Sequence, residues 1–338
     1  MFCYQCKDAS GGRGCVVKGN CGKTSECALL QDLLIQMLYG ICAYTTRANE
    51  LHSFDRDIDD FVEESLVATM TSQNHDPDSL RGLIARAVKV REWAKTLFEI
   101  ACVESRVEPY RLSGAFFVDP VDDPDAILDQ AWQYSIPLRR IRSSAQVVDL
   151  QEMILYGLKG LAWRNRRMTQ TGRRSFPMSA EIHSTMDFLS TEPEEERQLE
   201  QAALHIGQLY LEELERERGC RPEESFSPRF ESLLERDCCG LSLRIDGERD
   251  LDETLRFIQT FQARKSKDCE QKSVCDWSAN RIEPTDIHVD FFWEGQEGIS
   301  FYLALKRLGI HSVRMHPQPA FLPCLTTVCR RTAIAVKG

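Results

Sequence analysis

The sequence predicts a multidomain protein in which an all-α amino-terminal helical bundle precedes a smaller α/β domain. Three observations favour this class. Apolar residues recur at helical steps through residues 1–219, strand-like runs occur only after about residue 240, and a polar stretch with two prolines separates these parts. We therefore expect a helical domain over 1–219, a connection over 220–239 and a reduced, Rossmann-like remnant of an α/β domain over 240–338.

Three long helices are predicted first. The first follows Thr24 and Ser25, which are candidate N-caps, and the second spans Leu80–Cys102. The third spans Val147–Trp163, where Gly157 and Gly160 predict an interruption. Their apolar residues at steps of three and four are Leu29, Leu30, Leu33, Leu34, Met37, Leu38 and Ile41, then Leu83, Ile84, Ala87, Val88, Val90, Leu97 and Ile100, and finally Val148, Met153, Ile154, Leu158 and Leu161.

A fourth helix is predicted to begin at 190–193, with Pro193 in its first turn. The acidic residues 194–196 complement the helix dipole, and Gly219 ends the helix. Its apolar stripe is Leu199, Ala202, Ala203, Ile206 and Leu209. The boundary at Gly219 sets the end of the predicted helical domain.

The sequence pattern of the tail predicts an α/β segment. Gly240–Ile245 reads as a strand and Leu251–Phe261 as a helix. Ile287–Trp293, Gly298–Leu308 and Ile310–Met315 then predict a strand, a helix and a strand, which is the order of a parallel βαβ unit.

Four cysteines in the first 21 residues, Cys3, Cys6, Cys15 and Cys21, form the pattern C-x2-C-x8-C-x5-C among several glycines. Thiolates are the soft ligands of Fe-S clusters and of zinc, and glycines let the chain turn tightly around a small centre. We interpret the pattern as an iron-sulfur site. The spacing alone leaves open a structural zinc site and, less favoured, a pair of disulfides.

Composition indicates a globular protein of 338 residues, long enough for two or three domains, with 42% hydrophobic residues and a formal charge of -10. This acidity argues against nucleic-acid and anionic-membrane partners. We expect no run of the roughly 20 apolar residues that spans a bilayer. Because the chain starts without a secretory leader, we expect a cytoplasmic protein whose 14 cysteines are reduced.

Other candidate ligands have simpler interpretations. The cysteines Cys27, Cys42 and Cys102 fall within predicted helices, where a thiol acts as a small buried hydrophobe. In the tail, scattered reduced thiols and ordinary histidines are favoured over a second metal site. The residues concerned are Cys238, Cys239, Cys269, Cys275, Cys324, Cys329, His288, His311 and His316. The acidic runs 55–60 and 192–196 are interpreted as solvated helix starts. No nucleotide-binding or serine-hydrolase fingerprint is present in the sequence.

The cysteine pattern, followed by Gly22-Lys23 and 30–34 (LQDLL), closely resembles the hybrid cluster proteins, or prismane family. Further similar segments occur in the family's order at 155–160 (LYGLKG), 206–208 (IGQ), Trp293, Gln296, 308–309 (LG) and 319–322 (PAFL). The resemblance implies that Cys3, Cys6, Cys15 and Cys21 bind a 4Fe-4S cluster. It also implies an oxidoreductase that reduces hydroxylamine or nitric oxide at a second, hybrid Fe-S-O cluster.

The ligand motifs of that second cluster depart from the family pattern. Arg249 stands where the family's G-H-D-L has its histidine ligand, and arginine has no lone pair for iron. Gly295 stands at the ligand glutamate of W-F-E-Q-K, which Glu294 could replace only by a one-residue shift. The cysteine motifs between these points have no counterpart, and the chain is too short for both α/β domains of the family. We therefore expect the hybrid cluster to be absent.

These observations favour a redox protein that carries one electron at a time and works with a redox partner protein. The alternatives are an active hydroxylamine or nitric oxide reductase with a non-standard or partner-supplied second cluster, and a truncated inactive family member. A homodimer, or pairing with a full-length relative, is also expected, because a shortened tail leaves apolar surface uncovered.

Overall fold

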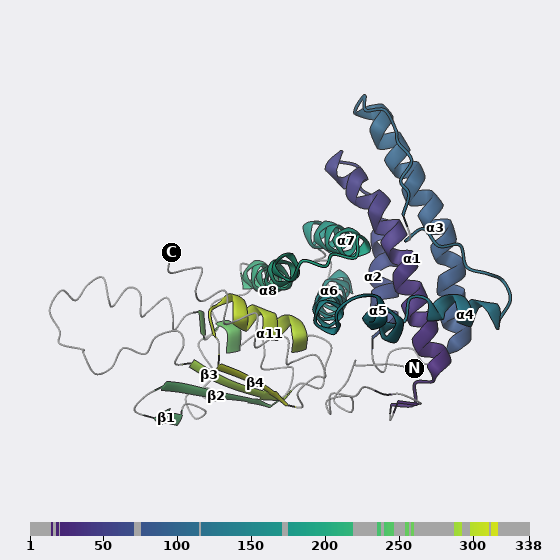
Figure 1. Cartoon of the computed structure of the whole chain (residues 1–338). Coiled ribbons are helices and arrows are strands. Elements are labelled where there is room, and N and C mark those ends of the chain that lie inside the picture. The colour runs from purple at the N-terminus through teal and green to yellow at the C-terminus, as the bar shows by residue number, and fades with distance from the viewer. Residues whose placement is uncertain are drawn as a thin grey trace.

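The computed structural model describes residues 15, 18–19, 21–70, 76–114, 116–170, 175–218, 235–237, 240–246, 254–256, 258–259, 287–292, 298–310 and 312–316. In Figure 1 the helices of the amino-terminal part lie on one side of the molecule and a small sheet lies on the other. The largely helical architecture predicted up to residue 219 is confirmed for the described residues.

Helix α1 (Ser25–Glu50) is the central element of the core. Thr24 is its N-cap, as predicted, because Thr24 Oγ1 accepts a hydrogen bond from the Cys27 amide at 3.2 Å. The helix is long and apolar enough to cross a membrane, so the expectation that no run reaches this length was wrong. However, 89% of its most apolar window is buried inside the protein, which is the pattern of a core helix.

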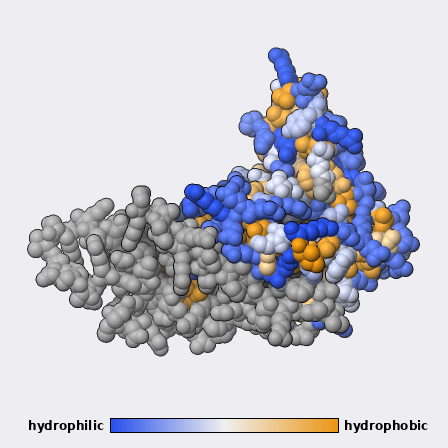
Figure 2. All heavy atoms as spheres, in the orientation of Figure 1, coloured by the Kyte–Doolittle hydropathy of each residue, from blue (hydrophilic) through white to orange (hydrophobic). Residues whose placement is uncertain are grey.

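Helix α3 (Pro77–Glu104) packs beside α1 and runs in the same direction, and both project from the body in Figure 1. Arg81 pairs with Glu26 near the start of both helices at 2.6 Å. The prediction that Ile100 belongs to the buried apolar stripe of α3 was wrong, because this side chain is 49% exposed. Figure 2 shows such hydrophobic side chains scattered among hydrophilic ones over the projecting helices.

Helix α2 (Arg56–Ala68) was predicted only at its start, and the helices α4 (Ala126–Trp132), α5 (Ile136–Arg142) and α7 (Phe176–Ser190) were not predicted. The first begins with Asp55, whose side chain accepts hydrogen bonds from the amides of Asp57 and Ile58. The interpretation of residues 55–60 as a helix start is thus confirmed. Short helices such as α4 and α5 span too few turns to show a periodic apolar pattern, which explains why they were missed.

Helix α6 (Ala145–Gln170) passes through Gly157 and Gly160 without a break, so the predicted interruption was wrong. Helix α8 (Glu196–Arg218) begins at Glu196. Pro193 therefore lies before the helix, and the prediction that it belongs to the first turn was wrong. Ser190 ends α7 instead, and Glu192 has a positive φ of 48°, which is incompatible with a helix there. The Pro193 carbonyl accepts a hydrogen bond from Gln151 Nε2 at 2.9 Å, which ties this turn to α6.

The described tail residues form a four-stranded sheet in the order β1-β2-β3-β4. The strands are β1 (Glu235–Asp237), β2 (Gly240–Asp246), β3 (Ile287–Phe292) and β4 (Ser312–His316). The first two are antiparallel, whereas β2 with β3 and β3 with β4 are parallel. Helix α11 (Gly298–Arg307) connects β3 to β4 along the chain. The assignment of this part as a Rossmann-like domain stays a prediction.

Helix α11 lies between the sheet and helices α6 and α8 (Figure 1). Glycines on both helices permit this contact. A Cβ on Gly207 would collide with the backbone of Leu303 in α11. A Cβ on Gly157 would lie 3.3 Å from Leu303 Cδ1 in α11 and 2.6 Å from Ile206 Cγ2 in α8. Ser300 Oγ also donates to the Gly157 carbonyl at 3.0 Å. The glycines therefore set how closely the helices pack.

Candidate metal centre

The described part of the cysteine loop contains two of the four predicted ligands. Cys15 and Cys21 are half-buried, and neither forms a disulfide within the described residues. Cys3 and Cys6 lie outside the described residues, so the complete set of four ligands stays a prediction. No group of three or more His, Cys, Asp or Glu side chains that could hold a metal ion occurs within the described ranges.

Cys21 sits in a tight turn that glycines make possible. The Gly19 amide donates to the Lys23 carbonyl and the Gly22 amide donates to the Gly19 carbonyl, both at 2.9 Å. Gly22 has a φ of 94°, which favours glycine. A Cβ on Gly19 would lie 2.9 Å from Cys21 Sγ, so the space over Gly19 is used by the sulfur. A compact turn with one half-exposed thiol suits a soft metal centre.

The turn leads directly into α1. Because the amide groups of a helix N-terminus carry partial positive charge, a thiolate close to this end is stabilised. Lys23 anchors the turn to the protein interior, since its side chain is only 1% exposed and its Nζ donates a hydrogen bond to Gln31 Oε1 at 2.7 Å. Gln31 Nε2 in turn donates to the Ala68 carbonyl at 3.3 Å. The cysteine turn is thereby fixed to α1 and to the end of α2.

Several polar and charged side chains line a small cavity beside α1. Arg139 on α5 pairs with Glu152 on α6 and donates to Gln151 Oε1 at 2.7 Å. Asp32 and Lys159 line the same cavity, whose volume is about 30 Å³. Residues from two segments that carry the family resemblance, 30–34 and 155–160, thus meet in space. Both segments resemble the family in sequence, but no local pattern within either segment signals this cavity.

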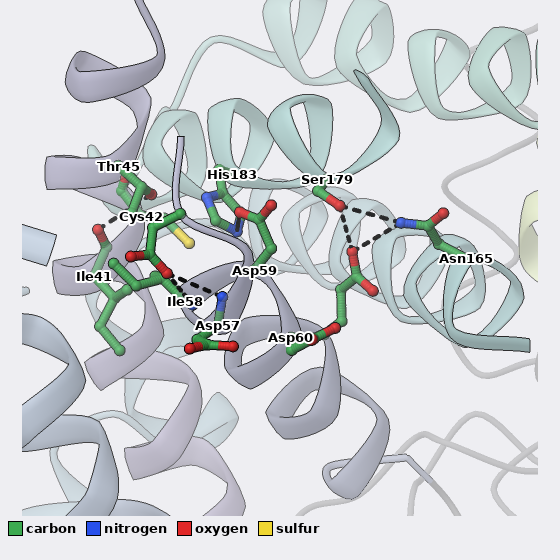
Figure 3. Close-up of polar contacts among 12 residues, drawn as sticks. Ile41, Cys42, Thr45, Asp57, Ile58, Asp59, Asp60, Asn165, Ser179 and His183 are labelled. Carbon is green, nitrogen blue, oxygen red and sulfur yellow. Dashed lines mark hydrogen bonds and ion pairs between the residues drawn. The ribbon is translucent and has the colours of Figure 1, made fainter. Parts of the chain in front are cut away.

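A buried network joins α2, α6 and α7 (Figure 3). Glu63 Oε1 accepts hydrogen bonds from Asn165 Nδ2 at 2.8 Å and from Ser179 Oγ at 2.7 Å. His183 is fully buried, and its Nε2 lies 3.6 Å from Asp59 Oδ1. Asp59 is itself only 6% exposed, so the expectation that the whole run 55–60 is solvated was wrong at this residue. No local pattern signals these contacts, which join residues far apart in the sequence.

The helical cysteines do not contribute to a site. Cys27, Cys42 and Cys102 have no exposed surface, which confirms their interpretation as buried hydrophobes. Burial raises the pKa of Cys42 well above its usual range, with smaller contributions from Asp187 and Asp59. A thiol held in the protonated form is a poor metal ligand and nucleophile.

The other tail candidates fall mostly outside the described residues. These are the segments 247–251 and 293–297 with Arg249, Glu294 and Gly295, the residue His311, and the cysteines Cys238, Cys239, Cys269, Cys275, Cys324 and Cys329. Of the remaining histidines, His288 is paired with Ser312 in the strand register and His316 with Phe292. They therefore stand near opposite ends of the β3–β4 pair.

Comparisons with known proteins match the amino-terminal part of the chain. The model of the Prismane/CO dehydrogenase family matches residues 1–215. A hydroxylamine reductase of Acidithiobacillus ferrooxidans is 33% identical over 219 residues, which cover 64% of this chain and 39% of that protein. A hydroxylamine reductase of Rhodospirillum rubrum is 31% identical over 211 residues, covering 62% of this chain and 38% of that protein.

The aligned region thus spans about two fifths of the length of these relatives. The residues matched by the family model include the cysteine turn, the helices α1 and α6, and most of α8. The resemblance recognised in the opening residues is confirmed. The chain belongs to the prismane/CO dehydrogenase family.

Proposed function

We propose that this chain is an iron-sulfur redox protein that binds one 4Fe-4S cluster through Cys3, Cys6, Cys15 and Cys21 and transfers single electrons to or from a redox partner protein. The observation that carries the proposal is the turn in which Gly19 leaves room for Cys21 Sγ. When bound, the cluster would supply a one-electron redox centre. Family membership supports iron-sulfur chemistry over zinc.

The chain's own residues would hold and tune this centre. Cys21 and Cys15 supply thiolates, and the amide groups of the turn and of the α1 N-terminus favour their negative charge. Lys23 adds a buried positive charge two residues after Cys21. We further propose a helical domain over 1–219, a connection over 220–239 and a Rossmann-like remnant over 240–338, with the hybrid cluster absent because Arg249 and Gly295 replace its ligands.

The names of the relatives support a second candidate, a hydroxylamine reductase. This function requires a second cluster in addition to the one at the amino terminus, either in a non-standard site or supplied by a partner chain. Pairing with a second copy or with a full-length relative would provide such a chain. An inactive family member would bind the first cluster without turnover.

Iron and sulfide quantification on anaerobically purified protein tests the proposal. About four irons per chain, with broad visible absorption that Cys15→Ser and Cys21→Ser each abolish, would support the single-cluster carrier. A matched control is Cys102→Ser, which changes a buried helical thiol outside the site. Seven or eight irons would support the reductase. Zinc in place of iron, or absorption that survives both ligand substitutions, would overturn the proposal.

A further inference from the structure

Asp32 lies on α1 among buried charges, about two helical turns beyond the cysteine turn. It lines the 30 Å³ cavity together with Glu152, Arg139 and Lys159. A polar cavity of this size has room for one or two water molecules with several hydrogen-bonding partners. Within the described part of the chain, the Asp32 carboxylate makes no hydrogen bond, so it is available to such a water.

The surroundings of Asp32 oppose its negative charge. Although the residue keeps some exposed surface, burial and, to a smaller extent, the nearby Glu152 carboxylate raise the pKa of its carboxyl to about 7. Arg139, Lys159 and Lys23 lower the pKa, but they do not cancel this increase. The other titratable side chains that face the cavity are Tyr39, Tyr134 and Glu192. Near neutral pH, a small change in local charge is enough to change the protonation of Asp32.

Asp32 is coupled to the cysteine turn through two neighbours. Gln31 precedes it on α1, lines the same cavity and accepts the hydrogen bond from Lys23 Nζ at 2.7 Å. Lys23 belongs to the turn that presents Cys21. Asp32 lies only about two helical turns after the start of α1, a rise of roughly 10 Å. A charge added at the start of α1 would therefore shift the pKa of Asp32 by roughly one unit.

We propose that Asp32 is a proton-loading site that takes up one proton from solvent when the amino-terminal cluster accepts one electron. The inference rests on the proposed function. An external one-electron donor, such as dithionite, reduces the cluster. The proton enters through the cavity water and forms an O–H bond with an Asp32 carboxylate oxygen. That bond breaks when the cluster is oxidised again, and the proton returns to solvent.

The test is the midpoint potential of the loaded protein, measured from pH 5.5 to 9 by spectroelectrochemistry. In the unsubstituted protein the potential should fall with rising pH around neutrality. In Asp32→Asn, which keeps the side-chain shape but cannot titrate, this dependence should be lost. Asp78→Asn is the control, because its side chain is 92% exposed in the first turn of α3, and it should behave like the unsubstituted protein.

A second measurement does not depend on the variant folding. The carboxyl carbon signal of Asp32, followed by NMR in the unsubstituted protein, should titrate at a pKa roughly one unit higher in the reduced state than in the oxidised state. Equal values, or a pH-independent potential in a protein that holds its iron, would overturn this inference alone. A chain that binds no iron would overturn the proposed function and this inference with it.

Discussion

Gly19 and Cys21 are arranged so that the sulfur occupies the space where a side chain at Gly19 would begin, with Sγ 2.9 Å from an ideal Cβ position. Real Cβ atoms do not tolerate a contact this short. The orientation of a predicted ligand thus depends on the absence of a side chain two residues earlier.

Gly19→Ala should lower iron incorporation several-fold, because the added methyl group forces Cys21 Sγ out of its position. Helix content, measured by far-UV circular dichroism, should stay unchanged. Gly82→Ala is the matched control, since nothing lies within 4 Å of a Cβ at that helical position. The control should retain iron and gain about 0.5–1 kcal/mol of stability. Full iron content in Gly19→Ala would show that the turn does not set the ligand geometry.

Gly207→Ala should destabilise the protein, because the new Cβ would collide with the backbone of Leu303 in α11. Backbone cannot move aside as easily as a flexible side chain, so we expect a loss of about 1–3 kcal/mol. Chemical denaturation with circular dichroism detection measures the change, again with Gly82→Ala as the reference. If Gly207→Ala unfolds at the same midpoint as the parent protein, the close contact of α11 with α8 is wrong.

The Glu63 network should contribute to stability through its buried hydrogen bonds. Ser179→Ala removes one donor to Glu63 Oε1 and should cost about 1–3 kcal/mol. Asn165→Ala should cost more, because Asn165 also accepts a hydrogen bond from the Ser175 amide at 2.9 Å. The control is Thr96→Ala, whose hydroxyl lies on the exposed side of α3. Equal free energies of unfolding for all three variants would contradict the network.

The pair formed by His205 and Glu181 predicts a pH-dependent stability. Their side chains are 2.9 Å apart, and the hydrogen bond raises the pKa of His205 and lowers the pKa of Glu181. His205 contributes its full share of the pair's stabilisation below about pH 6.5, and this share disappears as the pH rises through its raised pKa. Glu181 contributes its full share of the stabilisation above about pH 4.5, and this share disappears as the pH falls through its lowered pKa.

The pair should therefore stabilise the fold most between about pH 4.5 and 6.5, and by only about 0.2–1 kcal/mol because both side chains are nearly half exposed to solvent. The measurement is the difference in unfolding free energy between the parent protein and His205→Gln across pH 4–9. The difference should be largest near pH 5.5 and shrink on both sides. A difference that stays constant over this range would argue against the pair.

Much of the helical part was predictable because its signals are local. The apolar period after Thr24 and the capping hydroxyl determine where α1 begins, and both depend on residues within one or two turns. The same is true of Asp55 at α2 and of the buried thiol Cys27. The cysteine spacing with its glycines likewise pointed to a metal site, since the ligands and the turn are adjacent in sequence.

Only the tertiary structure decided where distant segments meet. Pro193 and the acidic residues after it carry the local signature of a helix start, yet α8 begins only at Glu196, after a turn in which Glu192 has a positive φ and Gln151 binds the Pro193 carbonyl. Gly157 signalled a break in α6, but packing against its neighbours makes a glycine compatible with a continuous helix.

The amino-acid sequence by itself determined the class of the protein, most helix positions and the candidate ligands, because capping, periodicity and ligand spacing are short-range properties. The cavity at Asp32, the contact of His183 with Asp59 and the docking of α11 required the fold. These features depend on burial and on distances between residues that are far apart in the chain, which no local pattern contains.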